Sequence, residues 1–306
     1  MARLGEAVQP VSPRNAIARA RLRASLVPDL LVEARRITNT VIAGWHGRRR
    51  RGTGENFWQF RPYVEGETMA RIDWRRSARD DQTYVRDLEW EAAHTVWLWA
   101  DPSASMLYKS GFGNVSKESR ALVLILALAE LLSRSGERIA WPGLTDPFSS
   151  RDGAERLAAR LGHEARFTPR PGLAPVSRYS DIVLAGDFLD PVEDTVRWLG
   201  PLAERGVRAH LIEVCDPAEE TFPYSGRTEF EDPETGEKLT AGRAETLVED
   251  YRRLYLARRE ELAAWCGRLG WSYTVSRTDR LASETLVKVH MAMTVNAAGS
   301  ARGPGR

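Results

Sequence analysis

Apolar residues along the chain fall into short runs and helical stripes that follow one another in a regular order. Short apolar runs bounded by turn residues are typical of buried strands, and apolar residues about 3.6 positions apart are typical of helices. The runs predict strands at Thr95–Ala100, Arg138–Trp141, Asp181–Gly186, Val207–Val214 and Trp271–Ser276. The stripes predict helices at Lys117–Ser135, Gly153–Leu161, Pro191–Arg205, Ala244–Leu269 and near Ala282–Met293.

This alternation predicts the fold class of residues 93–295. Strands that alternate with helices favour an α/β domain with a mostly parallel sheet covered by helices on both faces, a three-layer Rossmann-like arrangement. The helix Lys117–Ser135 is apolar nearly all round, so we expect it to be buried. Between Gly226 and Thr240, the polar stretch Asp232–Gly236 predicts the turn of an inserted hairpin.

Residues 15–92 have a different pattern and are predicted to form an N-terminal helix followed by a small β-rich segment. Apolar residues at helical spacing between Pro28 and Trp45 predict the helix. Six of the ten tryptophans lie between Trp45 and Trp99, and such large aromatic side chains build a compact core from few residues. Residues 1–14 and 296–306 are rich in small residues and proline and predict disordered tails.

The composition favours a globular protein without a membrane span. Apolar residues make up 42% of the chain and charged residues 28%. The longest apolar run, Ala121–Ala129, is much shorter than the roughly 20 residues that a spanning helix needs. The first residues lack the apolar core of a secretory signal, and two cysteines are too few for a disulfide framework. We therefore expect a cytoplasmic protein.

The charge is unevenly placed along the chain. The first 52 residues hold eleven arginines against three acidic residues, a net charge of +8, which leaves −6 for the rest of a chain whose total is +2. The run Arg48–Arg51, with Trp45 and Trp58 nearby, could bind single-stranded nucleic acid, since basic and aromatic side chains together hold such strands. A solvated basic extension is the interpretation we favour, and nucleic acid is not an expected partner.

A carboxylate and two hydroxyls follow the first predicted strand of the sheet. These are Asp101, Ser103 and Ser105, and Asp187 ends another predicted strand. The carboxyl ends of parallel strands meet at one edge of a sheet, where ligands bind. Such oxygen ligands suit Mg²⁺, and neutral serines would leave the ion able to accept a carboxylate from a partner. The alternative is that these residues only cap the following turn and helix.

The D-x-S-x-S spacing of Asp101, Ser103 and Ser105 resembles the metal-ion-dependent adhesion site of von Willebrand factor type A domains. The resemblance implies a von Willebrand A-like domain and metal ligands at Asp101, Ser103, Ser105 and Asp187. The family pattern also has a threonine on a loop ahead of the strand that ends in Asp187. Here that region offers Thr168 and Ser177, neither in the family's frame, so the Mg²⁺ site lacks one identified ligand.

A wider resemblance covers residues from about 45 to 285. Its motifs are Phe60–Glu67, Arg71–Arg79, Tyr84–Asp87, the D-x-S-x-S loop, Cys215–Glu219 and Pro223–Gly226. Together they are similar to the signature of a bacterial family called domain of unknown function fifty-eight. Members of that family join this segment to a von Willebrand A-like domain and commonly accompany a MoxR-type AAA+ ATPase. The resemblance therefore implies such an ATPase as partner.

Four residues of these motifs allow two interpretations. They are Asp73, Trp74, Arg75 and Arg79. Arginines beside carboxylates form bidentate pairs, which either lock the small segment onto the main sheet or bind a partner.

The leading functional hypothesis is a non-enzymatic, metal-dependent protein-interaction module that acts with the ATPase in protein or complex maturation. The metal would recruit an acidic residue of a client protein. A hydrolase that uses the Asp101, Ser103 and Ser105 loop is the alternative, together with nucleic-acid binding through Arg48–Arg51. The chain has no G-x-S-x-G elbow and no phosphate-binding glycine loop, and its five histidines lack ligand spacing. We therefore predict no catalytic residue.

Overall fold

The computed structural model describes residues 13–45, 57–64, 69, 72–79, 82–88, 94–163, 168 and 170–300. The chain forms two compact units, Trp45–Ala93 and the remainder. The Arg48–Arg51 run, residues 1–12 and residues 301–306 lie outside the described residues, so the structure does not bear on the predicted basic arm.

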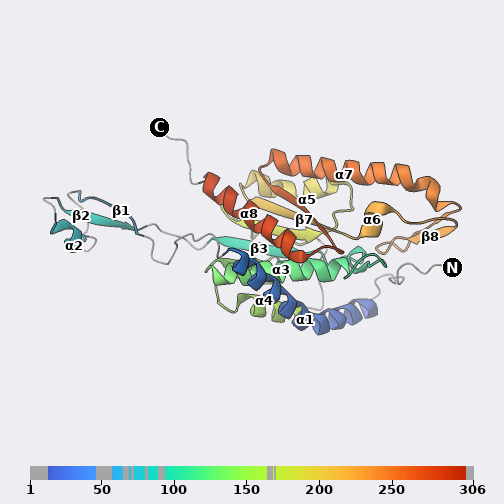
Figure 1. Cartoon of the computed structure of the whole chain (residues 1–306), viewed down its shortest axis with the longest axis horizontal. Coiled ribbons are helices and arrows are strands. Elements are labelled where there is room, and N and C mark those ends of the chain that lie inside the picture. Colours follow the sequence, from blue (N-terminus) through green and yellow to red (C-terminus); the bar gives the residue numbers. More distant parts are fainter. Residues whose placement is uncertain are drawn as a thin grey trace. The chain divides into compact units, whose positions relative to one another are not determined.

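The larger unit is built on a six-stranded sheet (Figure 1). Its strands are β3 (Thr95–Ala100), β4 (Arg138–Trp141), β5 (Thr145–Phe148), β6 (Asp181–Gly186), β7 (Arg208–Cys215) and β10 (Ser272–Arg277). They lie in the order β10-β7-β6-β3-β4-β5, and all neighbours are parallel except β4 and β5. The predicted mostly parallel sheet of an α/β fold is thus confirmed, with strand bounds that differ from the predicted ones by at most one residue.

Strand β5 is absent from the sequence prediction. It forms an antiparallel hairpin with β4 through a turn in which Gly143 has a φ of +76°. The strand is short, polar and interrupted by Pro147, which is tolerated because β5 lies at the edge of the sheet. Its sequence therefore carries no apolar run from which a strand could be predicted.

Helices cover both faces of the sheet. They are α3 (Lys117–Arg134), α4 (Gly153–His163), α5 (Val192–Glu204), α7 (Val248–Arg268) and α8 (Ala282–Ser300), with the short α6 (Pro217–Thr221) after β7. Helix α3 connects β3 to β4, which lies toward the β5 edge of the sheet. Helices α5 and α7 connect β6 to β7 and β7 to β10, toward the opposite edge. Because such crossovers are right-handed, α3 covers one face and α5 and α7 the other (Figure 1).

Helix α1 (Pro13–Trp45) belongs to the larger unit, which corrects the prediction that grouped it with the small β-rich segment. The Thr38 hydroxyl donates to the Ala127 carbonyl of α3 at 3.0 Å, and Arg35 forms ion pairs with Glu130 of α3 and Glu155 of α4. Helix α3 therefore lies between the sheet and α1, which explains why it is apolar nearly all round.

Helices extend into both segments predicted to be disordered tails. Helix α1 already begins at Pro13, and α8 continues to Ser300 instead of ending near Met293. Residues 13–14 and 296–300 are therefore helical rather than disordered.

The smaller unit contains an antiparallel pair, β1 (Phe57–Pro62) and β2 (Tyr84–Leu88), with the single-turn helix α2 (Trp74–Ser77) between them in sequence. Asp73 caps that helix, since its Oδ1 accepts from the Arg76 N–H at 3.0 Å. The Ser77 hydroxyl oxygen accepts from the Tyr84 N–H at 2.8 Å. These contacts join α2 to β2.

The predicted hairpin insertion is confirmed and consists of β8 (Thr228–Glu231) and β9 (Lys238–Ala241). Asp232 closes its turn by accepting from the Glu234 N–H at 2.8 Å and from the Thr235 hydroxyl at 2.9 Å. In β8, the Phe230 ring centroid lies 5.6 Å from that of Phe222 and 5.2 Å from that of Tyr224. The first strand of the hairpin is therefore packed on the segment that follows α6.

Candidate functional site

A cleft opens beyond the carboxyl ends of β3 and β6. From β3 the chain moves to β4, and from β6 it moves the opposite way to β7, so these neighbours form the switch point at which open α/β sheets bind ligands. The cleft has a volume of about 710 Å³. Its lining includes the four predicted site residues Asp101, Ser103, Ser105 and Asp187.

The loop after β3 is held in a tight turn. Asp101 Oδ1 accepts from the Ser103 N–H at 2.8 Å, and the Ser103 and Ser105 hydroxyl oxygens lie 3.1 Å apart. On the neighbouring strand, a Cβ at Gly186 would lie only 3.2 Å from the Asp101 Cβ, so glycine permits this close approach. Asp101 thus closes the turn, whereas Ser116 caps α3 by accepting from the Ser119 N–H. The two serines remain at the cleft.

Asp187 follows β6 and is buried beside an ammonium group. Its Oδ2 accepts from Lys117 Nζ at 2.9 Å, and its Oδ1 accepts from the Leu189 N–H at 3.3 Å. Burial acts to raise the pKa of Asp187, but the Lys117 charge and a hydrogen bond from Ser105 outweigh it and lower that pKa. Asp187 is therefore a carboxylate at neutral pH.

Lys117 is the main site residue that the sequence analysis missed. It is the first residue of α3, its side chain is 1% exposed, and its Nζ also donates to Glu219 Oε1 at 2.5 Å. Burial acts to lower its pKa, but the charges of Asp187 and Glu219 outweigh burial and raise it. A lysine in the first turn of an apolar helix is unfavourable to the helix dipole, and that is the sequence signal for acidic partners.

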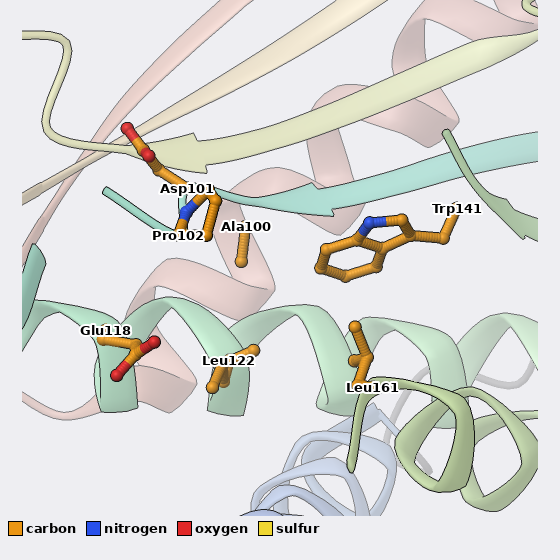
Figure 2. A pocket seen from close by; sticks show the side chains of 7 residues that line it. All are labelled: Ala100, Asp101, Pro102, Glu118, Leu122, Trp141 and Leu161. Atoms are coloured by element: carbon orange, nitrogen blue, oxygen red, sulfur yellow. The ribbon is translucent and has the colours of Figure 1, made fainter. Parts of the chain in front are cut away.

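Asp101 has no such cation beside it among the interactions that the structure gives. Burial, followed by the charge of Asp187, raises the pKa of Asp101 to about 7. Figure 2 shows its carboxylate at the end of β3, turned away from α3. The space beneath it, between Leu122, Trp141 and Leu161, is only about 10 Å³ and holds at most one water. The ligand-sized space is therefore the cleft on the other side of Asp101.

Thr168 and Ser177 are the two candidates for the threonine ligand, and one of them lines the cleft. Thr168 lines it, whereas the Ser177 hydroxyl lies 3.3 Å from that of Ser180 and is not among the lining residues. The rim adds further acidic residues, of which Asp190 is paired with Arg170 at 2.5 Å. The wall is partly aromatic, formed by Trp99, Phe188 and Trp198.

The Cys215–Glu219 motif supports the cleft from the end of β7. Asp216 is buried and accepts from the Ser110 N–H at 3.0 Å and from the Ala218 N–H at 2.9 Å. A Cβ at Gly113 would collide with the Asp216 carboxylate. Asp216 therefore anchors the segment that leads from the Asp101 loop to Lys117, and Glu219 completes the pair with that lysine.

The structure gives a role to one of the four residues Asp73, Trp74, Arg75 and Arg79. Asp73 caps α2 within that unit, as described above. Trp74 is 64% exposed, and Arg75 and Arg79 are exposed as well. The interpretation of these residues as a lock or a partner surface stays a hypothesis.

The donor set is chemically that of a hard cation. The lining includes the carboxylates of Asp101 and Asp187 and the hydroxyls of Ser103, Ser105 and Thr168, and Mg²⁺ prefers such oxygen ligands. Within the described part of the chain, no cluster of three or more His, Cys, Asp or Glu residues could hold a metal on its own, so hydroxyls are needed here. Of the described residues that line the cleft, none is a histidine or cysteine that could activate a serine.

None of the helices in the described ranges has the length and apolar character needed to cross a membrane.

Comparison with solved structures finds partial likenesses, among them two Bacteroides proteins. The conserved hypothetical protein BatB from Bacteroides thetaiotaomicron is 14% identical and covers 67% of this chain and 99% of its own, with a TM-score of 0.40. An aerotolerance-related membrane protein from Bacteroides fragilis is 16% identical and covers 66% of this chain and 98% of its own, with a TM-score of 0.37. At these TM-scores we draw no conclusion from either likeness.

Comparison of sequences is more informative. Uncharacterized proteins of Mycobacterium tuberculosis and Mycobacterium bovis are each 26% identical to this chain over 253 residues, which is 75% of this chain and 76% of the relative. The sequence pattern of a family described as "Protein of unknown function DUF58" matches residues 59–261, well over half of the chain. The chain therefore belongs to the DUF58 family.

Proposed function

We propose that the cleft binds Mg²⁺ and, through it, an acidic residue of a partner protein, so that the chain is a non-enzymatic interaction module. The observation that carries the proposal is the pair of carboxylates Asp101 and Asp187 in one cleft. Burial and the charge of Asp187 raise the pKa of Asp101 to about 7, so deprotonation of Asp101 is unfavourable unless a cation enters. A divalent cation would supply the missing positive charge.

The residues present fit such an ion. Asp101, Ser103, Ser105, Asp187 and Thr168 would hold it. Lys117 engages one oxygen of Asp187 and balances that carboxylate, which leaves Asp101 as the carboxylate without a counter-charge. The ion would supply an electron-poor centre with positions open to a carboxylate of the partner.

The finer identity of the fold belongs to the same proposal. The acidic loop at the switch point of a mostly parallel sheet supports a von Willebrand A-like domain with a metal-ion-dependent adhesion site. Resemblance to the family further suggests a MoxR-type AAA+ ATPase as the first partner to examine, with maturation of proteins or complexes as the process and the cytoplasm as the compartment.

The contacts of the two serines support a role in binding rather than hydrolysis. Ser103 Oγ contacts Ser105 Oγ, and the described cleft lining offers neither a histidine nor a cysteine. A serine nucleophile needs a base that takes its proton, and Asp101 is engaged with the Ser103 N–H instead. We therefore propose that the purified protein hydrolyses neither nucleotides nor simple esters.

Calorimetric titration of the full chain with Mg²⁺ tests the metal site. We expect the wild type to bind one ion and Asp101→Asn to bind it at least about tenfold more weakly, because the variant loses one of the two carboxylates. Asp194→Asn is the matched control, since Asp194 lines the same cleft but is paired with Arg197 at 2.6 Å. Equal affinity of the wild type and Asp101→Asn would contradict the proposal.

A pull-down tests the partner. The wild type is expected to retain an AAA+ ATPase encoded beside it in Mg²⁺, and to lose it in chelator or with Asp101→Asn. Retention that is unchanged by both would place the partner surface elsewhere.

A further inference from the structure

A third carboxylate reaches the loop of Asp101 from the inserted hairpin. Glu234 Oε1 accepts from the Ser105 N–H at 2.9 Å, across 129 residues of sequence. Glu234 and its neighbours Asp232, Pro233 and Thr235 line the cleft opposite the loop. The hairpin tip thus places a carboxylate beside the two serines that are candidate metal ligands.

The hairpin is built to hold the tip in this place. Its first strand is packed through Phe230 on Phe222 and Tyr224, and the Tyr224 hydroxyl lies 2.7 Å from that of Tyr108, which follows the Asp101 loop. Its tip is closed by Asp232, which accepts from the Glu234 N–H. Glu234 is therefore presented on a preorganised turn, as an acidic residue of a partner loop would be.

Glu234 brings a further negative charge to the loop of Asp101. Its charge adds to the burial and the Asp187 charge that raise the pKa of Asp101. Lys117 is already shared between Asp187 and Glu219, and Arg170, which lines the cleft, is paired with Asp190. A hydrogen bond from the Ser105 N–H holds Glu234 on this loop, so an acidic side chain from elsewhere that accepts the same hydrogen bond can take its place.

We propose that Glu234 occupies the docking position of the partner, and that the partner presents an acidic side chain on an exposed loop which displaces the hairpin tip. The inference rests on the proposed function in taking the cleft as the docking site. It adds that Glu234 marks the docking position and that Glu234 competes with the partner for this position.

Competition within one chain has a measurable consequence. A tethered group acts at an effective concentration in the millimolar range when the geometry suits it. If the tip occupies the cleft about 90% of the time, the apparent affinity for a carboxylate from outside falls about tenfold. Removing the tip should therefore strengthen binding of an external acidic loop by about that factor or more.

The experiment uses the full chain and a peptide copied from it. In the tip variant, Asn-Gly replaces Asp232–Glu237, because that pair forms a two-residue turn that keeps β8 and β9 joined. The probe is a fluorescent cyclic peptide of residues 228–241, compared with the same peptide in which Gln replaces Glu234. Glu237→Gln is the matched control protein, since Glu237 lies on the tip but does not line the cleft. Binding is followed by fluorescence anisotropy in Mg²⁺ and in chelator.

We expect the glutamate peptide to bind the tip variant at least about tenfold more tightly than it binds the wild type or Glu237→Gln. The glutamine peptide should bind none of them measurably. Failure of the glutamate peptide to bind the tip variant, or equal binding of the two peptides, would overturn the inference. The Mg²⁺ titration reports separately on the proposed metal site. If the protein binds Mg²⁺ but not the peptide, the proposed metal site stands and the inference about Glu234 fails. If the peptide binds equally in Mg²⁺ and in chelator, the proposed metal site fails as the docking point.

Discussion

Single side chains at the cleft differ in how their charges are balanced, although they lie close together. Asp187 and Glu219 share the buried ammonium of Lys117, whereas for the partly buried Asp101 the described interactions include no comparable partner. Burial and the charge of Asp187 therefore raise the pKa of Asp101 to about 7 from an ordinary value of 3.8. Asp101 is the residue at which the site should respond most strongly to pH and to cations.

We expect the contribution of Asp101 to the stability of the metal-free wild type to fall as pH rises between about 4 and 7. The folded protein keeps the Asp101 proton over this range while the unfolded chain loses it, so stabilisation present below the unfolded pKa is lost as pH rises through the folded one. Asp101→Asn should lack this loss and be more stable than the wild type at pH 8 by on the order of 2 kcal/mol. Urea unfolding in chelator at pH 4.5 and pH 8 measures both values.

Asp194→Asn provides the comparison, because Asp194 lies at the rim beside Arg197. It should follow the pH dependence of the wild type. If the free energies of unfolding of the wild type and Asp101→Asn differ by the same amount at pH 4.5 and pH 8, Asp101 does not titrate in this range.

Among the elements, α3 has the most demanding environment, because it contacts the sheet on one side and α1 on the other. On α1, Ala34 and Ile37 are buried, with 0% and 8% of their surface exposed. The contact between α1 and α3 includes the hydrogen bond from Thr38 to Ala127. Helix α1 is therefore part of the core of the α/β unit.

Ile37→Ala should consequently lower the free energy of unfolding by about 2 kcal/mol, because it removes buried methyl groups and leaves a cavity. Val32 lies on the same helix and is 68% exposed, so Val32→Ala should change the stability by less than about 0.5 kcal/mol. Chemical denaturation of both variants decides the point. Two equally small effects would mean that α1 does not stabilise the α/β unit.

At the scale of the whole molecule, the core and the candidate site are separate. The sheet is supported by fully buried residues, among them Leu98, Ile139 and Leu184. The site lies on the loops beyond the strands and contributes little to this core. The molecule therefore has the arrangement of a stable scaffold that carries a binding site on its loops.

Removal of divalent cations should accordingly shift the melting temperature by less than about 5 °C, the size of a ligand-binding effect on a domain of this length. Circular dichroism melts in Mg²⁺ and in chelator measure the shift. A structural metal behaves in the opposite way, because its binding energy is folding energy. Loss of the folded state in chelator would identify the ion as structural.

The strand pattern, the mostly parallel sheet and the meeting of Asp101 with Asp187 follow from the sequence. Apolar runs identify strands locally, and the carboxyl ends of parallel strands share one edge, so residues that follow two neighbouring strands come together. The inserted hairpin is equally local, since the turn residues Asp232–Gly236 specify it. Each of these features depends on short-range chemistry or on a general rule of sheet topology.

The tertiary structure alone decides which charges meet at the cleft. Lys117, Glu219 and Glu234 come from α3, α6 and the hairpin, and their convergence depends on how these elements pack, which no local pattern encodes. The same holds for β5, which exists only as a partner of β4, and for α1, whose apolar stripe does not say which helix it covers. Sequence periodicity specifies what a segment must bury, whereas packing selects its neighbour. Those neighbours determine the pKa of Asp101 and the position of Glu234.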